Sequence, residues 1–453
     1  MIARRALLQA MAAPAIVTAQ TKARPNILFF LTDQQHIDSI AAGGCRWAET
    51  PAMDSLVRRG MSFEQSYCPD PVCSPSRSSI FSGRMPSETG VPSNGRPIRE
   101  GIPNLGQWFS ENSDYETVYA GKWHVPRTYA TSIPGFRVLP GGISGQGNMG
   151  DSCVARSCEA YLRNRSSSKP FLLVASFLQP HDICEWLRIN MRNRDDVPFA
   201  ELRDQLPPLP ANFDIAGEEP EHLKRTRGRC EPAMGKWSRQ HWRYYLWSYY
   251  RHVEMVDGEV GRVLQALRDA GREKDTLIVL TADHGEGLAH HQMVRKSISY
   301  DEAVRVPLLV SWPEGIPRNR TDRTHPVSGV DLVPTLCDYA GIRAPAEMRG
   351  RNLRPLLEDR REDRERFIVS EIPVNVGRVV RTERYKYVTY ADDPVEQLFD
   401  MRHDPGETRN LAQSHPAVLA QHRKLLREWE ARLTPATDSP HAEWWRNLSP
   451  TAP

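Results

Sequence analysis

Three apolar runs in this chain end in polar side chains, and this pattern constrains the fold more than any other feature. The runs cover 27–31, 171–177 and 276–282. A strand without alternating polar residues is buried on both faces, as in the sheets of α/β proteins. If the first and third runs lie parallel in one sheet, their acidic ends meet at the edge where open α/β sheets bind ligands.

The residues that follow the first and third runs suit a divalent cation. Asp33 follows the first run, and Asp283 and His284 follow the third. Carboxylate oxygens are the ligands that hard cations prefer, and the imidazole adds one nitrogen to the set. A capping role for Asp33 is the simpler alternative when that residue is considered alone.

The segment from Cys73 to Arg77 predicts the start of a helix with an unusual chemical character. Pro75 suits the first turn of a helix, and Ser74 or Ser76 can cap it. Cys73 then lies at the positive end of the helix dipole, which favours an anion. Arg77 offers a planar fork of donors for sulfate or phosphate oxygens. A buried structural cysteine beside a surface arginine gives the same pattern by chance.

This segment resembles the maturation signature of the type I, formylglycine-dependent sulfatases of the alkaline phosphatase-like superfamily. In that family a sulfatase-maturing enzyme oxidises the cysteine to formylglycine. The hydrated aldehyde has two geminal hydroxyls, of which one attacks sulfur and the other later expels the sulfate. The resemblance therefore implies that Cys73 carries the nucleophile and that a maturing enzyme is a partner.

Three further elements resemble those of the family in the same chain order. A Gly-Lys-Trp-His run contains Lys122 and His124; in the family this lysine contacts the sulfate, and the histidine holds the formylglycine hydroxyl. His181 follows the second apolar run, where the resemblance implies a general acid. Lys296 matches a lysine that binds sulfate oxygens, although the neighbouring Arg295 leaves the register open.

The resemblance also implies a complete metal site. We expect a divalent ion, Ca²⁺ first with Mg²⁺ or Mn²⁺ as alternatives, to be bound by Asp33, Gln34, Cys73, Asp283 and His284. Many members have two consecutive acids where this chain has Asp33 and Gln34, so the site has one negative charge fewer and Gln34 is expected to bind through its carbonyl oxygen. We expect Arg77, Lys122 and Lys296 to offset charge on the sulfuryl oxygens.

The predicted fold is α/β, with a large mixed sheet flanked by helices and a small C-terminal domain formed by an antiparallel sheet and a helix. The expected divisions are an export signal at 1–20, a catalytic domain at 21–345 and the C-terminal domain at 346–453. The irregular stretch 188–237 is expected to pass over the mouth of the active site. A helix at 242–270 carries an aromatic stripe, which we interpret as core.

Composition and the N-terminal pattern restrict the partners and the location. A formal net charge of +3 gives no reason to expect nucleic acid as a partner. Arg4 and Arg5 precede a short apolar run, which is similar to a twin-arginine export signal and too short for a membrane anchor. We expect a periplasmic or secreted protein, with a cytoplasmic enzyme as the alternative. The eight cysteines lack paired spacing, so neither a disulfide scaffold nor a zinc module is indicated.

The sequence therefore predicts a sulfatase that hydrolyses a sulfate ester, with a sulfated glycan favoured over a sulfated small molecule. Two alternatives stay open: a phosphodiesterase or phosphonate monoester hydrolase on the same scaffold, and a sulfated-glycan-binding protein whose cysteine is never converted. Relative turnover of an aryl sulfate and a phosphonate monoester tests the first alternative. Binding without hydrolysis would support the second.

Overall fold

The computed structural model describes residues 24–141, 146–190, 200–214, 217–234, 237–360, 366–373, 376–391 and 393–436. The predicted export signal at 1–20 lies outside this part of the chain. Among the described helices, none combines the length and the apolar character that a membrane crossing needs.

An eight-stranded mixed sheet forms the centre of the protein, in the order β5-β4-β6-β1-β7-β8-β2-β9. β1 (Asn26–Asp33) lies between β6 (Phe171–Pro180) and β7 (Thr276–Ala282) and is parallel to both. The three predicted apolar runs are therefore adjacent central strands. The other strands of this sheet are β2 (Met61–Phe63), β4 (Glu116–Gly121), β5 (Arg137–Val138), β8 (Leu308–Ser311) and β9 (Arg320–Asp322). β8 is antiparallel to β7, which makes the sheet mixed, as predicted.

The register of the three central strands places their polar ends at one edge. Asp33 is opposite Pro180 of β6, and Thr32 is opposite Ala282 of β7. The residue after Asp33 is Gln34, the residue after Pro180 is His181, and the residue after Ala282 is Asp283. The predicted meeting of the first and third strand ends is confirmed, and the end of β6 joins them.

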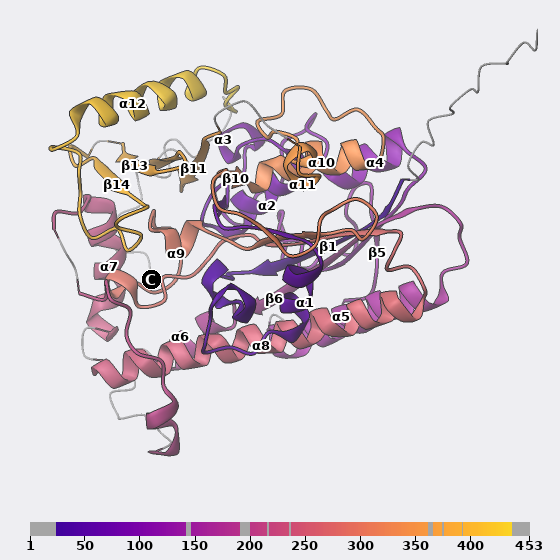
Figure 1. Cartoon of the computed structure of the whole chain (residues 1–453), viewed down its shortest axis with the longest axis horizontal. Helices are drawn as coiled ribbons and strands as arrows, with labels where there is room; N and C mark the ends of the chain where they lie inside the picture. The colour runs from indigo at the N-terminus through magenta and orange to yellow at the C-terminus, as the bar shows by residue number, and fades with distance from the viewer. Residues whose placement is uncertain are drawn as a thin grey trace, which may run out of the picture.

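Helices cover both faces of the sheet because alternate side chains of each strand point to opposite sides (Figure 1). Leu28 and Phe30 of β1 pack with α1 (Pro51–Arg59), α5 (Gly147–Asn164) and α8 (Arg239–Asp269). Phe29 and Leu31 face a second core that includes α2 (Cys73–Ser82), α4 (Leu105–Asn112) and α10 (Leu332–Tyr339). The sheet is thus the middle layer of three.

Shorter elements connect these layers. Up to residue 357, the remaining described helices are α3 (Pro86–Thr89), α6 (Ile183–Asn190), α7 (Glu221–Met234), α9 (Asp301–Val304) and α11 (Arg354–Leu357). The 3₁₀ turns are η1 (Ile37–Ser39), η2 (Ala41–Gly43), η3 (Ala200–Gln205), η4 (His290–Gln292) and η5 (Gly329–Asp331). β3 (Ser66–Tyr67) and β10 (Val327–Ser328) pair in a separate two-stranded sheet.

A four-stranded antiparallel sheet follows near the C-terminus, as predicted. It consists of β11 (Ile368–Ile372), β12 (Gly377–Arg381), β13 (Tyr385–Tyr390) and β14 (Gln397–Asp400). The predicted closing helix is α12 (Pro416–Glu430), which packs against this sheet (Figure 1). The domain boundary near 345 stays a prediction.

Buried polar contacts join this C-terminal part to the catalytic part. Lys386 of β13 lies 2.7 Å from Asp301 of α9 and 2.7 Å from Glu407. In α3, the Glu88 carboxylate accepts hydrogen bonds from the Arg349 side chain and from the backbone N–H of Thr434. The last described residues therefore pack against the elements that follow α2.

Candidate active site

Cys73 is the first residue of α2 and is fully buried. The N-cap residue Val72 makes no side-chain capping bond, and the backbone N–H of Ser74 donates to Asn94 Oδ1 at 2.9 Å. The Ser74 hydroxyl instead donates to the carbonyl oxygen of His124, and the Ser76 hydroxyl donates to that of Asp283. The predicted capping by these serines is therefore wrong, because both hydroxyls reach the ends of neighbouring strands. These two contacts bring the helix start to the polar edge of the sheet.

Residues from four separate strand ends and loops converge on the Cys73 side chain. The Sγ atom lies 2.9 Å from Lys296 Nζ and 3.1 Å from His284 Nε2. His124, which follows β4, and His181, which follows β6, also hydrogen-bond to this side chain. The sequence predicted all of these as site residues, and the structure brings them together.

Four of the predicted metal ligands form one buried cluster. One ligand atom from each of Asp33, Cys73, Asp283 and His284 lies within 4.8 Å of all the others. Gln34 Oε1 is close to the same cluster, since both this oxygen and Cys73 Sγ lie 2.9 Å from Lys296 Nζ. Two carboxylates, an imidazole and an amide oxygen form a donor set that suits a hard divalent cation.

The two carboxylates of the cluster influence each other's ionisation. Burial and the charge of Asp33 raise the pKa of Asp283 to about 6. Burial and Cys73 would also raise the pKa of Asp33, but Lys122, His181 and Arg77 hold it well below its usual value. Lys122 Nζ lies only 2.6 Å from Asp33 Oδ2. A divalent cation between two such carboxylates would relieve their mutual repulsion, so the residues fit the expected ion.

The Arg77 guanidinium binds these carboxylates. Its Nε donates to Asp283 Oδ2 at 2.7 Å, and its Nη2 donates to Asp33 Oδ2 at 3.0 Å. Its Nη1 donates to the Lys122 carbonyl oxygen and to Ser176 Oγ. Arg77 is fully buried. Every nitrogen of the guanidinium therefore has a protein partner, and Arg77 holds two of the predicted metal ligands, Asp33 and Asp283; its expected role in offsetting charge on the sulfuryl oxygens stays a prediction.

The position of the Cys73 side chain is strongly electropositive. Burial alone would raise the pKa of the Cys73 thiol, but Lys122, Lys296 and His284 hold it well below its usual value. The same cations would stabilise any anionic group that occupies this position. Lys122 and Lys296 are thus placed, as predicted from the sequence, to offset negative charge beside residue 73.

The two histidines beside Cys73 have lowered pKa values. Burial, followed by the charge of Lys122, lowers the pKa of His181. Burial also lowers the pKa of His124, although its hydrogen bond to Cys73 opposes the shift. Nδ1 of His124 is buried and has no hydrogen-bond partner among the described residues. Both imidazoles therefore give up a proton more readily than a free histidine.

Comparison with protein families shows which family the chain belongs to. The family model described as Sulfatase matches residues 25–342, and the model described as N-sulphoglucosamine sulphohydrolase, C-terminal, matches residues 289–433. This chain belongs to the sulfatase family. The first match contains every predicted site residue, and the second extends over the C-terminal sheet and α12. The protein is therefore a hydrolase of sulfate esters.

Individual relatives of this sulfatase extend over nearly its whole length. It is 34% identical over 446 residues to the Delta 4,5-hexuronate-2-O-sulfatase of Bacteroides thetaiotaomicron, and the alignment covers 91% of this chain and 90% of that protein. The solved structure of a 2-O GAG sulfatase superposes with a TM-score of 0.80 at 32% identity, covering 92% of this chain and 95% of the other.

A second solved structure concerns the alternative activity. The phosphonate monoester hydrolase of Agrobacterium radiobacter superposes with a TM-score of 0.72, covering 90% of this chain and 96% of the other. Its sequence identity is 22%, so the likeness shows a shared fold. The scaffold that the sequence analysis assigned to both activities is therefore common to the two enzymes.

Three residues of this sulfatase's site were missed by the sequence analysis. Glu286 contacts Gln34, Tyr245 contacts Glu286, and Tyr249 contacts the backbone of Gln34. The aromatic stripe of α8 is buried, as predicted, but its hydroxyl groups reach the site. The available signal was the acid three residues after Asp283, on the segment that leaves β7.

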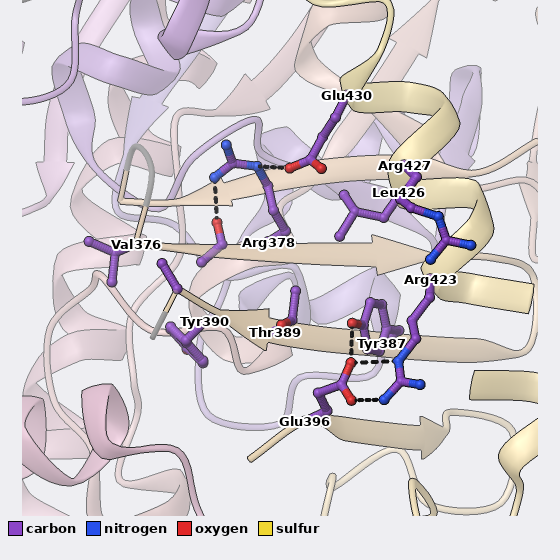
Figure 2. Close-up of a pocket in the computed structure, with 12 residues that line it drawn as sticks. Val376, Arg378, Tyr387, Thr389, Tyr390, Glu396, Arg423, Leu426, Arg427 and Glu430 are labelled. Carbon is purple, nitrogen blue, oxygen red and sulfur yellow. Dashed lines mark hydrogen bonds and ion pairs between the residues drawn. The ribbon is translucent and has the colours of Figure 1, made fainter. Parts of the chain in front are cut away.

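A separate cavity of about 370 Å³ lies between the C-terminal sheet and α12 (Figure 2). Arg423 pairs with Glu396 there, and Arg378 lies 3.5 Å from Glu430 (Figure 2). None of the predicted site residues lines this cavity. Since these two arginines are balanced by glutamates of the same walls, we do not assign the cavity to catalysis.

Proposed function

We propose that this sulfatase hydrolyses the sulfate ester of a sulfated glycan, with a 2-O-sulfated uronate as its preferred target. The observation that carries the proposal is the convergence of Lys296, His284, His124 and His181 on the Cys73 side chain. The choice of sugar is supported by the hexuronate-2-O-sulfatase of B. thetaiotaomicron, which aligns along 91% of this chain.

We propose that Cys73 is converted to formylglycine by a maturing enzyme. The hydrated aldehyde supplies one hydroxyl that attacks sulfur and a second that later expels the sulfate. His181 then donates the proton that the leaving alcohol oxygen needs, and His124 accepts the proton that must be lost before sulfate departs. Lys122 and Lys296 stabilise the negative charge on the sulfuryl oxygens.

We propose that Asp33, Gln34, Asp283, His284 and the converted side chain of residue 73 bind a divalent ion, Ca²⁺ before Mg²⁺ or Mn²⁺. When bound, the ion polarises the sulfate group. Removal of the ion with a chelator should abolish turnover, and Asp283→Ala should be inactive even in excess Ca²⁺. Asp257→Asn, which alters a buried acid that binds the backbone of α1, is the matched control and should retain activity.

The substrate is tested by measuring sulfate release from a panel of sulfated compounds. The panel contains unsaturated disaccharides sulfated at the uronate 2-position or only on the hexosamine, an aryl sulfate, choline sulfate and a phosphonate monoester. We expect the 2-O-sulfated uronate to be hydrolysed fastest, with Cys73→Ala as the blank. Turnover restricted to the aryl or choline ester would contradict the glycan proposal. A faster phosphonate monoester would favour the alternative activity.

We also propose that residues 1–20 direct export to the periplasm or beyond. The support is the pair Arg4 and Arg5 ahead of a short apolar run. Replacing both arginines with lysine should leave the protein in the cytoplasmic fraction, whereas the unaltered chain should be recovered outside it with a shortened N-terminus. An unaltered chain that stays cytoplasmic would contradict export.

A further inference from the structure

Gln34 is fixed in a backbone conformation that few residues adopt. Its φ is 68°, a left-handed value that is strained for a residue other than glycine. Its backbone N–H donates to Asp283 Oδ1 at 3.1 Å, and its carbonyl oxygen accepts from the Tyr249 hydroxyl at 2.9 Å. Gln34 is fully buried. The surrounding residues therefore determine where its side chain lies.

The orientation of the Gln34 amide depends on Glu286. Gln34 Nε2 donates to Glu286 Oε2, and Gln34 Oε1 accepts from Lys296 Nζ at 2.9 Å. An ionised carboxylate accepts hydrogen bonds and donates none. In the opposite orientation two oxygens would face each other beside Glu286, and the NH₂ group would face the Lys296 ammonium. The carbonyl oxygen is thus directed toward the side that contains Cys73.

Glu286 is itself held firmly on its other oxygen. Oε1 accepts from the Tyr245 hydroxyl of α8 and from the backbone N–H of Arg295. Glu286 and Tyr245 are fully buried. Since one oxygen is committed to these two donors, the other is left to receive the Gln34 NH₂ group.

We propose that Glu286 is a positioning residue of the metal site, which selects the orientation in which the Gln34 carbonyl oxygen, and not the amide nitrogen, faces the ion. This inference rests on the proposed metal site and adds the residue that makes an amide usable in it. An amide nitrogen has no lone pair available for a cation, so the wrong orientation removes one ligand. Partners that orient ligands in this way typically affect metal affinity about 10–100-fold.

The first test is Glu286→Gln, which preserves shape but provides a single acceptor oxygen. That oxygen accepts the hydrogen bonds from Tyr245 and the Arg295 N–H, so the new NH₂ group faces the Gln34 NH₂ group. The repulsion between the two NH₂ groups favours rotation of the Gln34 amide into the opposite orientation. Ca²⁺ alone is titrated into the Cys73-converted protein, and the heat of binding is measured by calorimetry. The affinity of Glu286→Gln for Ca²⁺ should be lower than that of the unaltered protein by about tenfold or more. Affinity equal to that of the unaltered protein would overturn the proposal.

A reciprocal exchange distinguishes positioning from a merely structural role. In Gln34→Glu with Glu286→Gln, the NH₂ of residue 286 donates to one carboxylate oxygen of residue 34, and the second oxygen faces the ion. This double variant should recover affinity for Ca²⁺ relative to Glu286→Gln. Gln34→Glu alone places two buried carboxylates in contact and should unfold at a lower temperature than the unaltered protein. A double variant no better than Glu286→Gln would overturn the proposal.

Two further variants serve as a control and as a substitute for Glu286→Gln. Glu371→Gln changes a buried glutamate that binds Ser87, away from the metal cluster, and should leave Ca²⁺ affinity unchanged. Should Glu286→Gln fail to fold, Tyr245→Phe removes one donor to Glu286 Oε1 and should still weaken Ca²⁺ binding; unchanged affinity there overturns the proposal. If the unaltered protein binds no divalent ion, the metal site itself fails, and this inference fails with it.

Discussion

The Lys296 ammonium lies 2.9 Å from the Cys73 sulfur, across 223 positions of sequence. The neighbouring Arg295 is exposed, and its backbone N–H donates to Glu286. The sequence alone left the register between these two cations open. In the fold, the lysine is the one that reaches residue 73.

Lys296→Ala should therefore impair catalysis far more than Arg295→Ala. Loss of one charge that stabilises the sulfuryl oxygens typically costs about 10²–10³ in kcat, whereas truncating Arg295 keeps the backbone N–H that holds Glu286. Steady-state kinetics on the best substrate of the panel measures both variants. Equal losses in the two variants would mean that the lysine has no special role.

Conversion of Cys73 should be visible by mass spectrometry. In a host with a sulfatase-maturing enzyme, the peptide that contains Cys73 should lose one sulfur and two hydrogens and gain one oxygen, and activity should rise with the converted fraction. Cys73→Ala should fold and be inactive. Cys153→Ala, at an exposed free cysteine, is the matched control. A fully active enzyme with an unmodified Cys73 thiol would contradict the mechanism.

Arg77→Met should destabilise the protein severely. Removing one partner of a buried ion pair typically costs about 3–5 kcal/mol, because the remaining charge stays buried without compensation; here Asp283 loses its guanidinium partner, and Asp33 keeps only the Lys122 ammonium. The free energy of unfolding, from denaturant titration without added metal, measures the loss. Arg163→Met, which breaks partly exposed ion pairs, is the comparison and should cost less than about 1 kcal/mol. If Arg77→Met and Arg163→Met lowered the free energy of unfolding by similar amounts, the ion pairs of Arg77 with Asp33 and Asp283 would not contribute the expected stability.

Asp151→Asn should become relatively more stabilising as pH rises. Burial raises the pKa of Asp151 to about 8, although the backbone N–H groups of Leu178 and Gln179 oppose the shift. Between the ordinary aspartate pKa and about 8, the folded state holds a proton that the unfolded state lacks, so the Asp151 contribution to stability falls as pH increases.

Asparagine does not titrate, so the difference in melting temperature, variant minus unaltered protein, should increase from pH 5 to pH 8. Thermal unfolding at both values measures it. The Asp257→Asn variant, at a group whose pKa is raised only to about 6, should show most of its change below pH 7. A difference for Asp151→Asn that stays constant with pH would show that this carboxyl does not bind the predicted proton.

The sequence was sufficient for the features that depend on strand order and strand ends. β1 and β7 could be recognised as buried strands whose acidic ends would meet if the strands were parallel, and the structure shows that they are parallel. Features that depend on competition between side chains could not be predicted. Arg77 was expected to offset charge on the sulfuryl oxygens, and its hydrogen bonds to Asp33 and Asp283 were not predicted.

The tyrosines of α8 show the same limit. Periodicity predicted that Tyr245 is buried, and it is. The partner of its hydroxyl, Glu286, is 41 positions away in sequence and becomes its neighbour only after α8 packs beside the end of β7. Helical periodicity identifies the buried face of a helix but says nothing about which polar atom a buried hydroxyl will meet.

The burial of α2 limits the time during which Cys73 is accessible while the chain is synthesised. Cys73 is inaccessible in the finished fold, and Glu88, which follows it closely, receives its last described hydrogen bond from Thr434. About 360 residues separate Cys73 from Thr434, and ribosomes add roughly 5–20 residues per second, so the fold around α2 is incomplete for roughly 20–70 s. An enzyme that oxidises Cys73 must act within that interval or on a chain kept from folding. The proposed conversion of Cys73 would therefore depend on the translation rate.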